Sequence, residues 1–335
     1  MKIITFFNNK GGVGKTSLLC NMASYLAINS NKKVLVVDAD PQCNATIYLL
    51  DELMIKKIYT DRMHETIQSY ITPLRKGKGY AKKNFIPVKS PRFGVYVMPG
   101  DPALALSEDL LATDWKTSVS GDARGLQTTF VFEDMFSRFD DYDYVFVDVS
   151  PSLGAINRAV LLASDFFVMP LSSDIFSLMA VKNISQAVSK WMKDIKKALE
   201  QYQEQEDQCF KVKSTKVSWK LRFCGYVTQQ YTAKTIRGVR EPVKAYDKII
   251  KRVAPAIHKE IVGKLNSPMS IKYDLGSIPN LNSIIPLSQN ANAPIFDLKG
   301  SDGVVGAHFE KVKEAGALMN ALVANLVTNV CALSK

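Results

Sequence analysis

The chain has 335 residues, of which 47% are hydrophobic and 22% are charged. This balance is typical of a folded globular protein and excludes a disordered chain. The five scattered cysteines have no Cys-x-x-Cys spacing, which excludes a zinc site or a disulfide framework. The sequence contains no apolar run of membrane-spanning length and no signal-peptide pattern, so we expect a cytoplasmic protein.

The formal net charge of +11 is concentrated in two segments. Residues 51–92 contain ten basic and four acidic residues, and residues 182–272 contain twenty basic and eight acidic residues. The rest of the chain is net acidic. A concentrated basic surface indicates a polyanionic partner, nucleic acid first and anionic membrane second. An ordinary lysine-rich solvated surface is the alternative.

The first predicted element is a buried strand over Lys2–Phe7, and a glycine-rich loop follows it. Apolar residues recur at helical spacing from Ser17 onward, so the loop joins a strand to a helix. Glycines let successive backbone N–H groups point at one anion, and the helix N-terminus adds partial positive charge. Lys15 is placed to bind the β- and γ-phosphates of a nucleotide, and the Thr16 hydroxyl to ligate Mg²⁺. The predicted cofactors are ATP and Mg²⁺, held by Lys10, Gly11, Gly12, Val13, Gly14, Lys15, Thr16 and Ser17.

This loop departs from the usual P-loop sequence at two positions. Asn9 stands where the first glycine of that pattern is expected, and Lys10 adds a second lysine. The run Lys10–Thr16 resembles the deviant Walker A motif of the ParA/MinD superfamily of ATPases, and is most similar to ParA-type partition ATPases. This resemblance implies a homodimer in the ATP state, in which Lys10 reaches across the interface to the phosphates bound by the other subunit.

Two carboxylates follow the second predicted strand, Val34–Val37. Asp38 and Asp40 lie at its C-terminal end, where ligands bind in an open α/β sheet. Carboxylates there can hold Mg²⁺-bound water and orient an attacking water. The segment Asp38–Gln42 resembles the Asp-x-Asp-Pro-Gln segment of ParA-type ATPases, with Cys43 in place of the usual glycine. By that resemblance, Asp38 lies near the metal and Asp40 positions the water that attacks the γ-phosphate.

A third carboxylate ends the apolar strand predicted over Tyr144–Val147. This is the Walker B arrangement, in which Asp148 binds Mg²⁺ through water. The segment is similar to the family's Asp-x-Pro-Pro-Ser-Leu-Gly, except that Ser150 replaces the first proline, and we expect this to loosen the loop after the strand. The predicted catalytic residues are Lys10, Lys15 and Asp40, and the predicted metal ligands are Thr16, Asp38 and Asp148.

Further apolar runs predict buried strands over 95–98, 166–169 and 223–227, and a short strand that ends at Ile278. Helical patterns separate most of these strands. Together they predict an α/β fold, a doubly wound and mostly parallel sheet with helices on both faces, as in a P-loop NTPase.

We expect one domain over residues 1–335, because no linker divides the chain. Two insertions are expected, at about 52–94 and about 190–220, and a C-terminal helix is expected at about 303–333. The lysines, glycines and prolines of the first insertion indicate irregular structure.

A basic segment from Lys234 onward is the candidate DNA surface. Its basic residues recur mostly at three- or four-residue spacing from Glu241 on, as on one face of a helix. The candidate DNA contacts are Lys234, Arg237, Arg240 and Lys244; a solvated helix face is the alternative. The first functional hypothesis is therefore a ParA-like switch whose ATP-bound dimer binds DNA nonspecifically, with nucleoid association, until hydrolysis releases it.

Two other functions remain open. One is a MinD-like adaptor that recruits a protein partner or the membrane. The predicted C-terminal helix has no basic residue between Lys313 and Lys335, which disfavours a membrane. The other is an ATPase that regulates a neighbouring effector in plasmid, phage or defence biology. In each case we expect slow hydrolysis stimulated by a protein activator, because one water-orienting carboxylate without a supplied arginine is weak catalysis.

Overall fold

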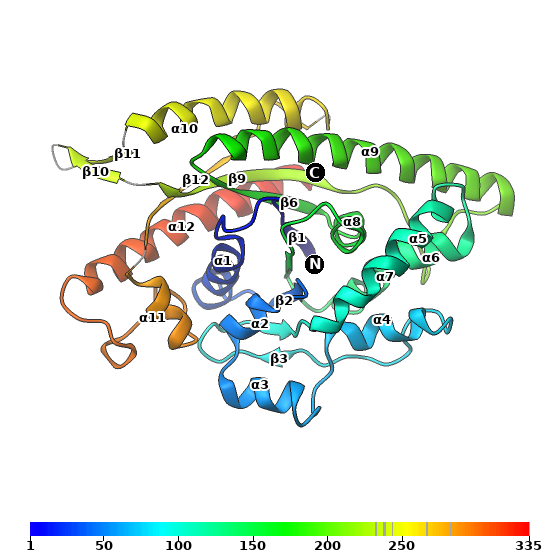
Figure 1. Ribbon diagram of the computed structural model, residues 1–335, viewed down its shortest axis with the longest axis horizontal. Helices are drawn as coiled ribbons and strands as arrows, with labels where there is room; N and C mark the ends of the chain where they lie inside the picture. Colours follow the sequence, from blue (N-terminus) through cyan, green and yellow to red (C-terminus); the bar gives the residue numbers. More distant parts are fainter. Residues whose placement is uncertain (232, 237–238, 243, 266, 282, 335) are drawn as a thin grey trace.

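The computed structural model describes residues 1–231, 233–236, 239–242, 244–265, 267–281 and 283–334. An eight-stranded sheet with the order β12-β9-β6-β1-β5-β2-β4-β3 forms its centre (Figure 1). All neighbours from β12 to β4 pair in parallel, and the edge strand β3 pairs antiparallel with β4. The strands are β1 (Lys2–Phe6), β2 (Val34–Ala39), β3 (Val88–Lys89), β4 (Tyr96–Met98), β5 (Tyr144–Val149), β6 (Phe166–Ser172), β9 (Arg222–Tyr231) and β12 (Asp274–Pro279).

The predicted mostly parallel sheet is confirmed, because each predicted apolar run lies in a parallel strand. The short strand expected to end at Ile278 corresponds to β12. The antiparallel strand β3 was not predicted. It is two residues long, which is too short to show an alternating pattern.

Helices cover both faces of the sheet, as predicted for a doubly wound fold (Figure 1). In β1, Ile4 and Phe6 pack with α1 and α12, whereas Ile3 packs in the core that contains α8 and α9. Strands buried on both faces appear in sequence as continuous apolar runs. The longer helices are α1 (Lys15–Asn29), α5 (Glu108–Ser118), α9 (Ile175–Glu206), α10 (Lys244–Ile257) and α12 (His308–Leu333).

Shorter elements complete the fold. The short α-helices are α2 (Asn44–Leu49), α3 (Glu52–Tyr59), α4 (Ile67–Arg75), α6 (Ala123–Thr129), α7 (Val131–Phe136), α8 (Ala155–Leu162) and α11 (Ile285–Asn290). Short helices of other types are η1 (Pro102–Ser107), η2 (His258–Val262) and η3 (Gly300–Asp302). Two small hairpins pair β7 (Lys211–Val212) with β8 (Thr215–Lys216), and β10 (Ala233–Ile236) with β11 (Val239–Pro242).

The first expected insertion is more ordered than its composition indicates. It contains α3 and α4, so the expectation of irregular structure is wrong for these two segments. In α4, Ile67, Tyr70, Ile71 and Leu74 recur at helical spacing and are buried in the core on the α8–α9 face of the sheet. Glycines, prolines and lysines around these positions dominate the composition and conceal the periodicity.

In the second expected insertion, α9 continues to Glu206 and the β7–β8 hairpin follows. The rings of Tyr202 on α9 and Phe210 beside the hairpin pack edge to face, with centroids 5.2 Å apart. The buried Phe210 and Val212 share a small core with Ile195 of α9. The hairpin is therefore fixed against the C-terminal half of α9.

The helix α12 is long and apolar enough, by length and composition, to cross a membrane. In this structure it packs on β9, β12 and α1. Its buried residues recur at three- or four-residue spacing and form one stripe that faces the sheet. They are Val312, Ala315, Met319, Leu322, Val323, Leu326, Asn329, Val330 and Leu333.

Replacing Leu326 tests this packing. Leu326 is fully buried, so Leu326→Ala should lower the free energy of unfolding by about 2–5 kcal/mol through lost transfer energy and a new cavity. Thr328→Ala, on the exposed face of the same helix, should change it by about 0.5 kcal/mol or less. Urea unfolding followed by circular dichroism measures both values. Equal values for the two variants would contradict the packing of α12 on the sheet.

Candidate nucleotide-binding site

The glycine-rich loop that joins β1 to α1, here called the P-loop (residues 10–17), has the backbone of an anion-binding loop. Gly12 and Gly14 have φ angles of 72° and 74°, in the left-handed region that favours glycine. Nothing lies within 4 Å of a Cβ built on Gly12, so the requirement there is conformational rather than steric. Because α1 begins at Lys15, the free N–H groups of its first turn face the loop.

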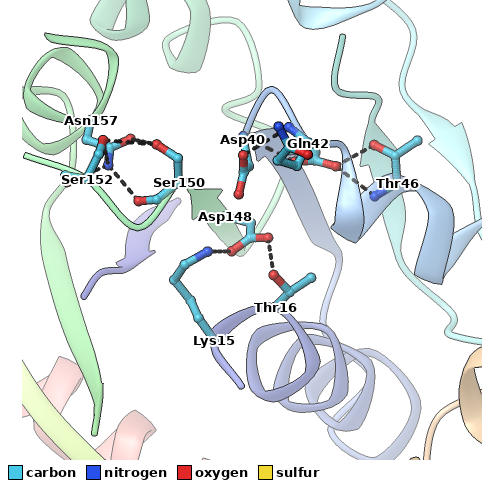
Figure 2. Close-up of polar contacts among 10 residues, drawn as sticks. Lys15, Thr16, Asp40, Gln42, Thr46, Asp148, Ser150, Ser152 and Asn157 are labelled. Carbon is cyan, nitrogen blue, oxygen red and sulfur yellow. Dashed lines mark hydrogen bonds and ion pairs between the residues drawn. The ribbon is translucent and has the colours of Figure 1, made fainter. Parts of the chain in front are cut away.

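Lys15, Thr16 and Asp148 meet at the start of α1 (Figure 2). Lys15 Nζ lies 2.6 Å from Asp148 Oδ1, and the Thr16 hydroxyl donates a hydrogen bond of 2.7 Å to Asp148 Oδ2. The side chain of Asp148 is fully buried and that of Lys15 is 7% exposed. A buried charge stays uncompensated when its partner is removed, so such a pair is costly to break. The structure thus brings three predicted site residues into one cluster.

Asp38 lies beside Asp148 because β2 and β5 are in register at these two residues. Asp38 Oδ2 accepts hydrogen bonds from the Thr46 backbone N–H at 2.8 Å and the Thr46 hydroxyl at 2.7 Å. Burial and the charge of Asp148 raise the pKa of Asp38 to about 7, although hydrogen bonds from Thr46 and the Asp40 backbone lower it. Thr46 was not singled out from the sequence, although it follows Asp38 within the same segment.

Asp40 lies on the turn after β2 and is 3% exposed. Its Oδ1 accepts a hydrogen bond of 3.0 Å from the Gln42 backbone N–H (Figure 2). Burial raises the pKa of Asp40, while the Gln42 hydrogen bond and the charge of Lys15 oppose that rise. The carboxylate is therefore held within electrostatic range of the Lys15–Asp148 pair.

Lys10 does not join this cluster. Its ammonium group contacts the Asp174 carboxylate and lies 2.9 Å from the Ser172 hydroxyl. Asp174 is the N-cap of α9, where its Oδ1 accepts hydrogen bonds from the N–H groups of Phe176 and Ser177. Burial raises the pKa of Asp174, but the hydrogen bonds from Lys10 and Ser172 and the charge of Lys10 hold it below its usual range. The second lysine of the loop thus forms a partly exposed ion pair beside the site.

The loop after Asp148 is held by residues that the sequence analysis did not single out. Asn157 Nδ2 donates hydrogen bonds to the carbonyl oxygens of Ser150 at 2.7 Å and Ser152 at 2.8 Å (Figure 2). The Glu108 carboxylate accepts hydrogen bonds from the first backbone N–H groups of α8. These hydrogen bonds hold the segment that contains Ser150, and the expectation that Ser150 loosens this loop stays a prediction.

A cavity of about 470 Å³ opens beside the P-loop, within the size range of small-molecule sites. One wall comes from α11. This helix packs against α2, where the hydroxyl of Tyr48 lies 2.5 Å from the hydroxyl of Ser288 on α11. These two residues are separated by 240 positions, so no local pattern could predict the contact. The lining residues are Gly14, Lys15, Thr16, Ser17, Asn44, Ile47, Tyr48, Gln289 and Asn290.

The candidate DNA contacts lie on a hairpin and the helix that follows it. Lys234 lies in β10, Arg240 in β11 and Lys244 at the start of α10, whereas Arg237 lies outside the described residues. The helix expected from Glu241 onward begins later, at Lys244, because Glu241 pairs with β10. Since β9 runs parallel to the P-loop strand, the hairpin after β9 lies at the same edge of the sheet as the P-loop (Figure 1).

The chain matches one protein family and is similar to several known proteins and solved structures. Residues 1–201 match the AAA domain family. The virulence plasmid ParA family protein pGP5-D of Chlamydia psittaci is 31% identical over 189 residues, which are 56% of this chain and 64% of that protein. Protein DIP2308 of Corynebacterium diphtheriae is 32% identical with a TM-score of 0.71, covering 87% of this chain and 97% of that one. An ATP complex of Cyanothece McdA shares the fold at 17% identity, with a TM-score of 0.56 and coverage of 94% and 96%.

The chain therefore belongs to the AAA domain family, and its similarity to a ParA family protein identifies it as a member of the ParA/MinD superfamily of ATPases. The resemblance to the ParA/MinD superfamily that Lys10–Thr16 indicated is confirmed by these matches. The match spans 64% of the length of the Chlamydia relative, so the activity and partners of that protein do not transfer by similarity alone.

Lys15→Ala tests the site directly. We expect ATP affinity to fall by roughly 30-fold or more, since removing one member of a buried charged contact costs about 2–5 kcal/mol. Lys32→Ala, at an exposed position after α1, should leave the affinity unchanged. Isothermal titration calorimetry measures both, and unchanged binding by Lys15→Ala would contradict the assignment.

Proposed function

We propose that this member of the ParA/MinD superfamily is an ATP-dependent switch that dimerises with ATP bound and hydrolyses ATP slowly with Mg²⁺. The observation that carries the proposal is the buried cluster of Lys15, Thr16 and Asp148 at the end of a glycine-rich loop. A cation, a hydroxyl and a carboxylate are the groups that phosphoryl transfer in P-loop enzymes takes from the protein.

The cluster fits Mg²⁺. This ion binds oxygen at about 2.0–2.1 Å in octahedral geometry and usually keeps several water ligands. Thr16 Oγ1 would bind it directly, and Asp148 Oδ2, which lies 2.7 Å from that hydroxyl, would accept a hydrogen bond from a metal-bound water. No group of three or more His, Cys, Asp or Glu side chains within the described residues is suited to hold a metal.

Each predicted residue then has a role. Lys15 would bind the β- and γ-phosphates, and Asp148 would hold water bound to Mg²⁺, which would supply positive charge to neutralise the phosphates. Asp38 supports Asp148 from the neighbouring strand. Asp40 orients the attacking water, and burial raises its pKa, which makes its carboxylate a better proton acceptor.

The nucleoside part of ATP is assigned to the cavity beside the P-loop. The cavity begins at Thr16 and Ser17, which continue directly from the phosphate-binding backbone. Ile47 offers an apolar surface there, and Gln289 and Asn290 offer amide groups that can hydrogen-bond a base or a ribose. These lining residues support a role for α11 in nucleotide binding.

The ion pair of Lys10 supports dimerisation. Lys10 binds Asp174, away from the P-loop cluster of its own subunit, and is available to a second subunit. Beside it, α9 begins with Ile175, Phe176 and Met179, whose side chains are 45%, 62% and 57% exposed. Exposed apolar side chains that gather beside a functional residue are typical of a protein interface. We infer that a second copy covers this apolar surface and receives Lys10 at its phosphates.

Nonspecific DNA binding by the dimer is supported by the positive charge of the hairpin and helix that follow β9. The hairpin and helix that carry Lys234, Arg240 and Lys244 lie at the edge of the sheet that binds ATP, so dimerisation there would bring two basic surfaces together.

A second candidate is an adaptor for a protein partner, or for an effector in plasmid, phage or defence biology, because the apolar start of α9 also suits a protein. Packing of α12 on the sheet disfavours membrane recruitment. In either case a protein activator would stimulate hydrolysis.

Two variants separate ATP binding from switching. Asp40→Ala should bind ATP and remain a dimer, because the attacking water is not oriented. Lys10→Ala should bind ATP and remain a monomer, because the contact across the interface is absent. Size-exclusion chromatography with light scattering, with and without ATP, gives the oligomeric state. A monomeric Asp40→Ala protein in saturating ATP would refute the role of Asp40.

Asp174→Asn tests whether the ion pair restrains Lys10. Asparagine retains the helix cap but loses the charge. The Lys10 and Asp174 side chains are 29% and 37% exposed, so the pair is worth at most about 1 kcal/mol. We expect the dimer dissociation constant in ATP to fall by about twofold to fivefold. In a Lys10→Ala background the substitution should have no effect, and an equal effect there would show that Asp174 acts independently of Lys10.

The Asp40→Ala dimer should bind duplex DNA of any sequence, with an affinity that falls steeply as salt rises. Lys234→Glu with Lys244→Glu should weaken binding uniformly and reduce the slope of log affinity against log salt by about 4, because the dimer carries each substitution twice. Fluorescence anisotropy at several salt concentrations measures the slope. Binding that is insensitive to salt, or absent from the ATP-bound dimer, would favour the adaptor function.

A further inference from the structure

The second expected insertion builds a groove that the proposed function does not use. One part of the groove, about 620 Å³, lies between α9, residues 218–222 and the segment after η2. The other part, about 230 Å³, lies between α9 and the β7–β8 hairpin. Lys196, Ser218 and Trp219 line both parts, so the two form one continuous surface, here called the α9 groove.

The α9 groove lies at the opposite edge of the sheet from the P-loop. Arg222, which lines the groove, is the first residue of β9 and pairs with Phe166, the first residue of β6. The P-loop instead follows the last residue of β1, which is parallel to both strands. The C-terminal half of α9 extends away from α10 toward α5 and α6 (Figure 1). A ligand in the groove therefore leaves the nucleotide site free.

The groove is strongly basic. Glu200 is the one acidic residue among its lining residues. Lys220 is neutralised by Glu133 at 2.9 Å and lies 3.8 Å from Asp165. The other basic residues have no ion-pair partner within the described part of the chain, so their charge is available to a ligand. The basic lining residues are Lys196, Lys216, Lys220 and Arg222.

Apolar side chains lie between these charges. Met192 and Leu199 project from the same stripe of α9 as Lys196, because the three recur at three- or four-residue spacing. Trp219 is partly buried and lines both parts of the groove. From Met192 to Gln203 the stripe is about 16 Å long, which matches about five residues of extended chain.

We propose that the α9 groove binds an acidic segment of a partner protein. One apolar side chain of the segment rests on Trp219 and Met192, and its carboxylates approach Lys196 and Arg222. Charge complementarity selects an acidic partner, and a concave surface with an aromatic anchor suits a peptide. Duplex DNA fits less well, because its phosphates lie on a convex surface while these basic residues line a concave one.

The test uses the full chain and a fluorescein-labelled peptide that alternates glutamate with leucine and phenylalanine. Fluorescence anisotropy should detect binding, and Lys196→Glu with Arg222→Glu should lower the affinity by at least about tenfold. The matched control is Lys193→Glu with Lys197→Glu. It makes the same charge change on exposed residues of the same helix that do not line the groove, and should change affinity by less than about threefold.

Three results would overturn the proposal. The first is an equal loss of affinity in both double variants, which would indicate nonspecific attraction. The second is no binding of the acidic peptide by the unaltered protein. The third is binding of labelled duplex DNA with an affinity that falls equally in Lys196→Glu with Arg222→Glu, which would assign the groove to nucleic acid. ATP binding and circular dichroism of each variant verify the fold, and ATP-dependent dimerisation tests the proposed function separately.

Discussion

The buried ion pair of Lys15 and Asp148 is the contact on which the site depends. Asp148 has no exposed surface, so its charge is balanced by Lys15 and by the Thr16 hydroxyl. The contact can form only if β1 and β5 are adjacent and in register, which the pairing of Phe6 with Asp148 shows. Glycines at the end of β1 then turn the chain so that Lys15 starts a helix directly above the carboxylate. The sheet, the loop and the helix are thus constrained by one buried charge.

The second lysine of the P-loop is held by a much weaker interaction. The pair of Lys10 and Asp174 is partly exposed on both sides, so water screens it and little free energy is lost when it opens. Lys15 in its buried pair is fixed unless a ligand supplies equivalent charge. This difference in burial suits Lys15 to the nucleotide of its own chain and, under the proposed function, Lys10 to a contact with a second chain.

The long helix α9 connects two surfaces of different chemistry. Its N-terminus is capped by Asp174 and presents exposed Ile175, Phe176 and Met179. Its C-terminal half forms one wall of the basic α9 groove at the other edge of the sheet. Between them, a buried stripe that includes Ile184 fixes the helix to the core. A partner at either end would therefore contact the same rigid element.

The sequence by itself determined the α/β fold, the parallel strands and the positions of the glycine-rich loop and of Asp38, Asp40 and Asp148 at strand ends. These follow from local patterns, because strand periodicity, loop composition and a terminal carboxylate are visible within a few residues. Only the tertiary structure decided which groups meet. Lys10 contacts Asp174 across 164 positions, α11 forms one wall of the cavity beside the P-loop, and Glu108 accepts hydrogen bonds from the start of α8. Such contacts depend on strand order, register and the docking of distant segments, which no local pattern encodes.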